Sequence, residues 1–288
     1  MMDAASVVNG TSARVRLAAC LAVGASGAIA RRAGPGRVLL GLVMIALGLR
    51  GLAFGDFAGV WQRIPIAHLP AHDAFVYLAA LVELATGLGI LVPRVAKASA
   101  ATMSAFALLW MVLLKFPAIL YAPSMEAVWL GAGEIAVILA GAWIVFASLS
   151  APGGRFLAGR NGIRNARLLF VLALPTIGLS HFVYADITAG FVPAWLPWRH
   201  GWAYLTGAGS LAAAIGILLA LWPRLAATLE AAMLGVITLL VWLPPLLAHP
   251  HDSDAWSAFL MSSAIAAGAA AVADSYRGIG WTARGPRA

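Results

Sequence analysis

Charged residues are scarce in this chain of 288 residues, and their scarcity decides the class of protein. Asp, Glu, Lys and Arg make up 10% of the chain, whereas 62% of the residues are hydrophobic and the mean hydropathy is +0.91. Soluble proteins carry about 25% charged residues. So few charges cannot cover a water-facing surface, which excludes a soluble globular protein and predicts a membrane protein.

Cysteine is nearly absent as well. The one cysteine, Cys20, excludes an intramolecular disulfide, a Cys-x-x-Cys redox pair and a thiolate-rich metal site. Acidic residues are few, since 11 Asp and Glu stand against 19 Lys and Arg and give a net charge of +8. In a soluble domain this excess would suggest nucleic acid, but in a membrane protein it is typical of cytoplasmic loops, so we expect no nucleic-acid partner.

Long apolar stretches are what the chain has in abundance. A helix needs about 20 apolar residues to cross a hydrocarbon core of roughly 30 Å. Eight stretches qualify, at residues 37–55, 74–92, 98–121, 127–148, 167–189, 202–222, 225–247 and 255–274. The predicted fold is therefore an all-α membrane protein with eight transmembrane helices in a lipid bilayer, and an even number of crossings puts both termini on one side.

The basic residues predict which side this is. Fifteen of the 19 Lys and Arg lie in the two tails and in the loops on the same side, whereas only Arg63 and Arg199 lie in the opposite loops. By the positive-inside rule, both termini are cytoplasmic. We expect a multi-pass protein of a bacterial inner membrane.

The N-terminal tail, residues 1–36, contains two patterns that resemble export signals. Two arginines precede the apolar run 17–30, as in a signal peptide, and Leu17–Cys20 resembles a lipoprotein cleavage box. However, no hydrophobic run precedes Cys20, and cleavage after Ala30 would leave three arginines on the outer side. We interpret this segment as a cytoplasmic tail.

The sequence repeats itself with a period near 130 residues. Tyr77, Leu84, Ala85 and Gly89-Ile90-Leu91 recur as Tyr204, Leu211, Ala212 and Gly216-Ile217-Leu218; Pro93-Arg94 recurs as Pro223-Arg224, and Asp56 as Asp186. The repeat predicts two tandem four-helix bundles, at residues 37–148 and 167–274, joined by a basic linker at 149–166 and followed by a tail at 275–288. Because each bundle has four spans, the two share a parallel orientation.

A family resemblance rests on the second span. In the run Val82–Arg94, Glu83 precedes small residues and an arginine stands at the following turn. This run resembles the second-helix signature of the DoxX-like family of four-helix integral membrane proteins, and the entry to the first span at Arg37 and Leu39-Leu40-Gly41 is also similar. The second half keeps the layout but has Ser210 in place of the glutamate.

The resemblance implies a fold and a compartment more directly than a reaction. DoxX-like relatives are linked to sulfur oxidation with quinones, to membrane oxidoreductase complexes and, in animals, to chaperoning. It therefore implies a quinone as the cofactor and other membrane or redox proteins as partners. Relatives that act on disulfides would need a pair of thiols, which this sequence lacks.

Four charged residues lie inside the predicted spans of the first half, namely Arg50, Glu83, Lys115 and Glu134. At about 1.5 Å per residue, each lies roughly 7 to 13 Å from the outer end of its helix. A charge at the centre of a span costs about 2.5 to 3.5 kcal/mol on insertion scales. We therefore predict a buried ionic cluster, neutral as a whole, that forms a structural core or a small-ligand site.

In the alternative interpretation, the two basic side chains reach outward separately and the two glutamates are protonated. The aligned positions of the second half are Ser180, Ser210, Pro245 and Met261, so the charges belong to the first half alone. We expect Glu230, near the cytoplasmic end of the seventh span, to reach the membrane interface.

His181, Tyr184 and Asp186 are secondary candidates near the outer end of the fifth span. The other five histidines lie in the outer loops without the spacing of a metal signature, so no metal site is predicted. A haem held by two histidines is disfavoured, because His181 has no second intramembrane imidazole to face.

These observations favour a non-enzymatic protein, because no set of catalytic residues is evident. The leading function is an accessory membrane subunit of a redox or quinone-linked complex. One alternative is a small-molecule or proton-coupled transporter that uses Glu83 and Glu134. The other is a membrane chaperone.

Overall fold

The structure is a computed structural model that describes residues 34–58, 70–151 and 156–285. All regular elements within these ranges are helices. Eight helical segments are long and apolar enough to span a membrane, which confirms the predicted class, a multi-pass all-α membrane protein. The two export-like patterns at residues 17–30 and Leu17–Cys20 lie outside the described residues.

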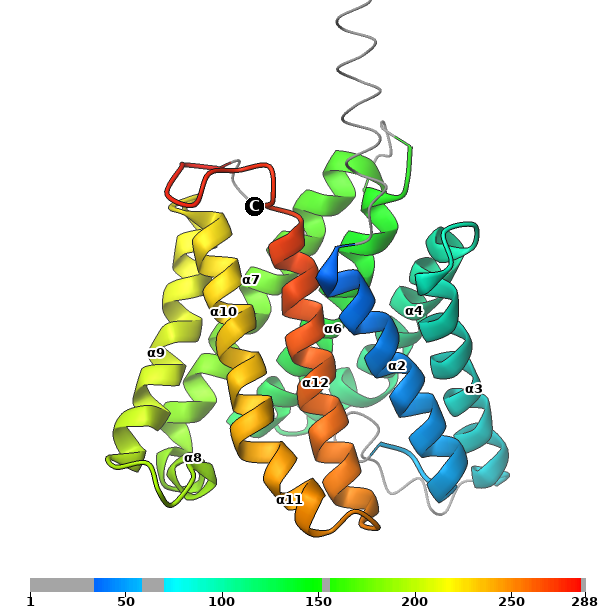
Figure 1. Cartoon of the computed structure of the whole chain (residues 1–288), viewed down its shortest axis with the longest axis horizontal. Helices are drawn as coiled ribbons and strands as arrows, with labels where there is room; N and C mark the ends of the chain where they lie inside the picture. Colours follow the sequence, from blue (N-terminus) through cyan, green and yellow to red (C-terminus); the bar gives the residue numbers. More distant parts are fainter. Residues whose placement is uncertain (1–33, 59–69, 152–155, 286–288) are drawn as a thin grey trace, which may run out of the picture. The chain divides into compact units, whose positions relative to one another are not determined.

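The chain forms one spanning helix after another (Figure 1). The first half contains α2 (Pro35–Phe54), α3 (His72–Leu91), α4 (Ala96–Trp110), η2 (Met111–Lys115), α5 (Phe116–Tyr121) and α6 (Glu126–Ser148). The second half contains α7 (Gly159–Val183), α8 (Ala185–Phe191), α9 (Arg199–Leu218), α10 (Pro223–Ile237), η3 (Thr238–Trp242), α11 (Leu243–Ala248) and α12 (Ser253–Asp274). We call the end where α2 begins and α12 finishes the terminal end, and the end that carries α8 and α11 the distal end.

The fifth span differs from the prediction of 167–189. Helix α7 begins eight residues earlier, at Gly159, so the helix occupies the last part of the predicted linker 149–166. Hydropathy detects only the apolar part of a helix, so a polar extension at the end of a spanning helix is not predicted. At the other end, Tyr184 leaves the helical conformation (φ −112°, ψ 40°), so Asp186 belongs to the separate helix α8.

The sixth span also differs from the prediction of 202–222. Helix α9 ends at Leu218 because Ala220 and Trp222 have positive φ angles of 56° and 50°, which form a tight turn. Pro223 then starts α10, whereas Pro93 lies in a turn before α4. The two prolines that the sequence repeat paired therefore do not occupy equivalent positions.

The third spanning helix of each half contains a π-helical turn. The segment η2 precedes Pro117, and η3 precedes Pro244. A proline has no N–H to donate and its ring clashes with the carbonyl one turn earlier, so a helix must adjust on the N-terminal side of it. A π turn is one such adjustment.

The second and third spanning helices of the two halves match in length. The three segments of the third helix have 15, 5 and 6 residues in both halves. His72 and Arg199, which begin α3 and α9, are 127 residues apart, and each follows a residue in the left-handed region. This register pairs Lys115 with Trp242, the last residues of η2 and η3, and not with Pro245 as the sequence alignment had it. The tandem duplication stays a prediction, which these matched helices support.

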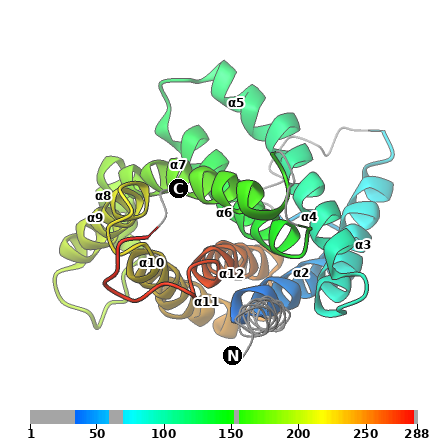
Figure 2. The ribbon, with the colours of Figure 1, turned by 90° about the horizontal axis from the view of Figure 1, so that it is seen from above.

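Helices α6 and α12 bring the two halves together. Helix α6 packs against α7, and α12 packs against α2, α6 and α10, so α12 lies among helices of both halves (Figure 2). The contact between α6 and α12 is closest at two glycines. A Cβ on Gly141 would stand 2.5 Å from the Cα of Gly268, and a Cβ on Gly268 would stand 2.6 Å from the carbonyl oxygen of Val137. Small residues therefore allow these two backbones to touch.

Candidate functional site

Arg50 is buried at the distal end of α2 and joins this helix to α12. Its guanidinium donates hydrogen bonds to the backbone carbonyl of Asp56 and to the hydroxyl and carbonyl oxygens of Ser253. The carboxylates of Asp56, Glu83 and Asp254 are near enough to interact electrostatically with its charge. The positive charge is thus compensated inside the protein, whereas the buried Nε has no hydrogen-bond partner among the described residues.

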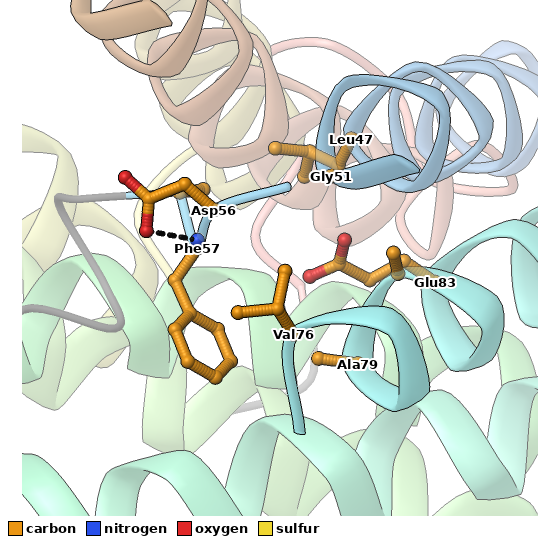
Figure 3. A pocket seen from close by; sticks show the side chains of 9 residues that line it. Leu47, Gly51, Asp56, Phe57, Val76, Ala79 and Glu83 are labelled. Carbon is orange, nitrogen blue, oxygen red and sulfur yellow. Dashed lines mark hydrogen bonds between the residues drawn. The ribbon is translucent and has the colours of Figure 1, made fainter. Parts of the chain in front are cut away.

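Glu83 lies on α3 beside a small hollow in the first half. The residue is 3% exposed and its carboxylate points into a hollow of about 10 Å³ between α2 and α3, as Figure 3 shows. Such a volume is roughly that of one water molecule. Asp56 lines the same hollow, and its Oδ1 accepts a hydrogen bond of 2.7 Å from the backbone N–H of Phe57. Arg50, Glu83 and Asp56 therefore form one charged group, which we call the α2–α3 charge group.

Lys115 and Glu134 form part of a second charged group, on η2 and α6. The charges of Lys115 and Glu126 both act on the carboxyl group of Glu134. Lys115 lies along the surface of α6 at Gly131, because a Cβ at this glycine would stand only 3.1 Å from Nζ. Both carboxylate oxygens of Glu126 are buried and have no hydrogen-bond partner in the described structure.

The four residues of the predicted ionic cluster thus lie in two groups, each with charges of both signs. That all four act together as one cluster stays a prediction. The structure adds three acidic residues at the distal end. Asp56 and Asp254 interact with the charge of Arg50, and Glu126 interacts with Glu134. Sequence reasoning missed these three acidic residues because they lie at the ends of spans, where a charge needs no explanation.

The second half has a buried acid of its own, contrary to expectation. Glu230 is 2% exposed, so its side chain lies inside the protein and does not extend outward from it. Its Oε1 accepts a hydrogen bond of 2.9 Å from the hydroxyl of Ser210, and its Oε2 has no partner in the described part of the chain. The prediction was wrong because it used only the position of Glu230 along the helix and not the side of the helix on which it lies. Glu230 lies on the side of α10 that faces α9. The predicted repeat pairs Ser210 with Glu83, and in the second half α10 supplies the carboxylate that Ser210 contacts.

The three secondary candidates have three different environments. The hydroxyl of Tyr184 accepts a hydrogen bond of 3.2 Å from the backbone N–H of Ala127 at the start of α6. Asp186 is exposed, with its Oδ1 3.0 Å from Nε2 of His200. His181 instead lines a large cavity. The structure therefore does not bring the three together.

This large cavity, which we call the distal cavity, has a volume of about 680 Å³. Helices α6, α7, α9, α10 and α12, the η3 turn and the segment from Thr188 to Leu196 enclose it. Pockets that bind small molecules have volumes of about 300 to 1,000 Å³ and walls that are mostly apolar with a few polar groups. The distal cavity fits this description. Trp195 lines it and is 70% exposed, so the cavity reaches the protein surface.

The polar groups of the distal cavity come from four helices and the α8 segment. They are Glu134, Ser180, His181, Thr188, Thr206 and Ser262. Glu134 is the one member of the predicted ionic cluster among them, so a residue of the first half contributes to a cavity of the second. Sequence reasoning had found Glu134 and His181 individually but not the cavity, because its wall is formed by helices that are far apart in the chain.

Metal binding has no obvious place in the described ranges. Among these residues, no group of three or more His, Cys, Asp or Glu side chains is arranged to hold a metal ion.

Two family models match parts of this chain. Residues 34–115 match DoxX, and residues 170–241 match a domain of unknown function, DUF8561. The chain matches no curated protein. It also matches no solved structure. The first match contains α2, α3, α4 and η2, including Arg50, Glu83 and Lys115. The chain is therefore a multi-pass membrane protein, and its residues 34–115 are similar to the DoxX family.

Proposed function

We propose that this protein is an accessory membrane subunit of a redox or quinone-linked process, and that the distal cavity is its ligand-binding site. The observation that carries this proposal is the cavity itself, with its volume of about 680 Å³ and its largely apolar wall. A quinone is an apolar molecule with a polar ring and has a size suited to such a space. The DoxX resemblance supports the same ligand class.

The apolar residues at the mouth of the cavity support entry from the bilayer. Leu205 on α9 and Val236 on α10 both line the cavity and are more than half exposed. A ligand dissolved in the hydrocarbon core would meet this wall without crossing water. Under this proposal, the partner protein would supply or remove the electrons.

The test is a binding titration with a quinone that carries a decyl chain. Trp195, Trp202 and Trp242 line the cavity, so a bound quinone is expected to quench tryptophan fluorescence in a saturable manner. Ala258→Phe would fill part of the cavity and should weaken binding at least tenfold. Ala105→Phe, on an exposed position of α4, is the matched control and should bind like the wild type. Equal binding by both variants would overturn the proposal.

Partners require a separate measurement. Purification from native membranes in a mild detergent should yield the protein together with at least one redox protein, and the absorbance spectrum of the complex would reveal that protein's cofactor. Recovery of the protein alone, with no bound quinone on extraction, would contradict the role of an accessory subunit.

A proton-coupled transporter is the second candidate, and the position of Glu134 in the wall of the distal cavity favours it. Glu83 lines the small hollow between α2 and α3 instead. Under this alternative, Glu134→Gln should abolish coupled uptake in proteoliposomes while Glu83→Gln retains it. If both variants keep full uptake, neither carboxylate is a coupling site. The role of a membrane chaperone stays a prediction from the family resemblance.

A further inference from the structure

The hydrogen-bonding side chains on the α7, α9 and α12 walls of the distal cavity are unequal in kind, because the protein itself uses their hydrogens. This asymmetry bears on which ligands the cavity accepts, and it is most evident at the wall formed by α7 and α9. There, Ser180, His181 and Thr206 are the polar side chains.

The imidazole of His181 has a defined tautomer in its neutral form. Its Nδ1 lies 2.7 Å from the hydroxyl oxygen of Thr206 and 3.3 Å from the carbonyl oxygen of Ala203. The hydroxyl of Thr206 already donates its hydrogen to the backbone carbonyls of its own helix, at 2.9 and 3.0 Å. A carbonyl oxygen can only accept. With the Thr206 hydrogen used in this way, the arrangement assigns the hydrogen of the neutral imidazole to Nδ1, and the lone pair of Nε2 makes that nitrogen an acceptor.

The nearby serines have likewise used their hydrogens. The hydroxyl of Ser180 donates to the carbonyl of Ile177 at 2.7 Å. On α12, Ser262 lies 2.7 Å from the hydroxyl of Thr238, which itself donates to the carbonyl of Leu234. Ser262 is therefore the donor in this pair, and its oxygen retains only lone pairs. The α7, α9 and α12 walls thus offer acceptors to a ligand.

A charged head group would be poorly suited to the same place. Its one acidic side chain, Glu134, already interacts with the positive charge of Lys115. An ion moved into an apolar cavity loses much hydration free energy unless a partner compensates it. A neutral donor, by contrast, would satisfy the imidazole nitrogen and the serine oxygens without such a cost.

We infer that the distal cavity binds an apolar molecule whose polar end carries a hydroxyl group, and that Nε2 of His181 accepts the hydrogen of that hydroxyl. This inference rests on the proposed function, in that it assumes the cavity is a ligand site. It adds a preference: the hydroxylated form of a ring or lipid binds more tightly than a form that can only accept hydrogen bonds.

The experiment compares matched ligands by isothermal titration calorimetry. The full-length protein in lipid nanodiscs is titrated under anaerobic conditions with a decyl-substituted hydroquinone and with the dimethyl ether of the same compound, and empty nanodiscs correct for partitioning into lipid. We expect the hydroquinone to bind about fivefold more tightly, the factor expected of one hydrogen bond of ordinary strength. 1-Monooleoylglycerol is titrated as a third ligand, because its hydroxyl groups are aliphatic and are not attached to a ring.

Variants of His181 identify the acceptor. His181→Phe should bind the ether as the wild type does but lose the preference for the hydroquinone, whereas His181→Gln, which retains an acceptor oxygen, should keep it. His249→Phe makes the same replacement on an exposed residue outside the cavity and should keep the full preference. An unchanged preference in folded His181→Phe would overturn the assignment. If that variant does not fold, His181→Leu, which also lacks an acceptor, replaces it in the same ligand comparison with the same expected loss.

The outcomes separate this inference from the proposed function. If neither the hydroquinone nor the ether binds above the lipid control, the cavity is no ligand site and both ideas fail. If both bind equally, the proposed function stands and the hydroxyl preference is wrong. Tight binding of the hydroquinone alone supports a ring hydroxyl, and comparable binding of 1-monooleoylglycerol supports a lipid alcohol.

Discussion

At the scale of single residues, the buried carboxylates of this protein differ in how they are compensated. Glu83 belongs to the α2–α3 charge group, in which Arg50 supplies the positive charge. Glu134 has the charge of Lys115 nearby. Glu230 has a neutral partner, since the hydroxyl of Ser210 donates to it. An acid with a single neutral hydrogen-bond donor is the most dependent of the three on that donor.

Ser210→Ala tests this dependence. The change removes the one hydrogen bond to Oε1 and leaves both oxygens of Glu230 buried without a partner, which should destabilise the protein by about 1 to 3 kcal/mol. Thermal unfolding in detergent would measure the loss. Ser263→Ala is the control, because its hydroxyl bonds only to the carbonyl of Phe259 in its own helix. A second variant, Ser210→Ala with Glu230→Leu, should recover stability, and no recovery would argue against this account.

At the scale of helices, close approach depends on particular glycines. The contact between α6 and α12 leaves no room for a side chain at Gly268, where a Cβ would meet the backbone of α6. Gly235 on α10 has the opposite environment, because nothing lies within 4 Å of where its Cβ would stand. The two glycines are both helical and differ only in their surroundings.

Gly268→Ala should therefore separate α6 from α12 and lower the unfolding temperature, with a cost of about 1 to 3 kcal/mol for the overpacked contact. Gly235→Ala should be neutral or stabilising by up to about 1 kcal/mol, because alanine favours the helix more than glycine does. Unfolding of both variants would be followed by circular dichroism in detergent. Equal effects at the two positions would show that helix propensity, and not packing, dominates.

The helices also show where the sequence was informative and where it was not. Apolar runs located all eight spans, since the bilayer imposes its thickness on any helix that crosses it. The ends of α7 and α9 were missed by several residues. Tyr184, Ala220 and Trp222 end or separate these helices through backbone angles that their residue types do not announce.

At the scale of the whole molecule, orientation in the membrane remains a prediction from the distribution of basic residues. The chain permits a direct test because Cys20 is its one cysteine, so Cys20→Ser gives a background without thiols. Into it we would place single cysteines at two exposed turns, Arg94→Cys at the terminal end and Ser124→Cys at the distal end.

With both termini in the cytoplasm, a membrane-impermeant maleimide should label the cysteine at position 124 in intact spheroplasts. The cysteine at position 94 should react only after the membrane is permeabilised. The opposite pattern would reverse the orientation and would place the distal cavity near the cytoplasmic face.

The candidate site was only partly foreseeable. Arg50, Glu83, Lys115 and Glu134 were found from the sequence because a charge in an apolar span needs compensation wherever the helix lies. The sequence did not predict that these four residues lie in two groups, because the grouping depends on which helices face one another. His181 was identified as a residue but not as an acceptor, because its tautomer depends on Ala203 and Thr206 of another helix.

What the sequence by itself determined is the class of protein and the number and order of the spans, because hydropathy and the length of a helix are local properties that the bilayer selects. Only the tertiary structure decided that α6 and α12 of different halves touch, that Glu230 is buried against Ser210, and that Glu134 and His181 line one cavity. These are contacts between residues far apart in the chain. Their geometry follows from how the helices rotate and pack, which no local pattern specifies.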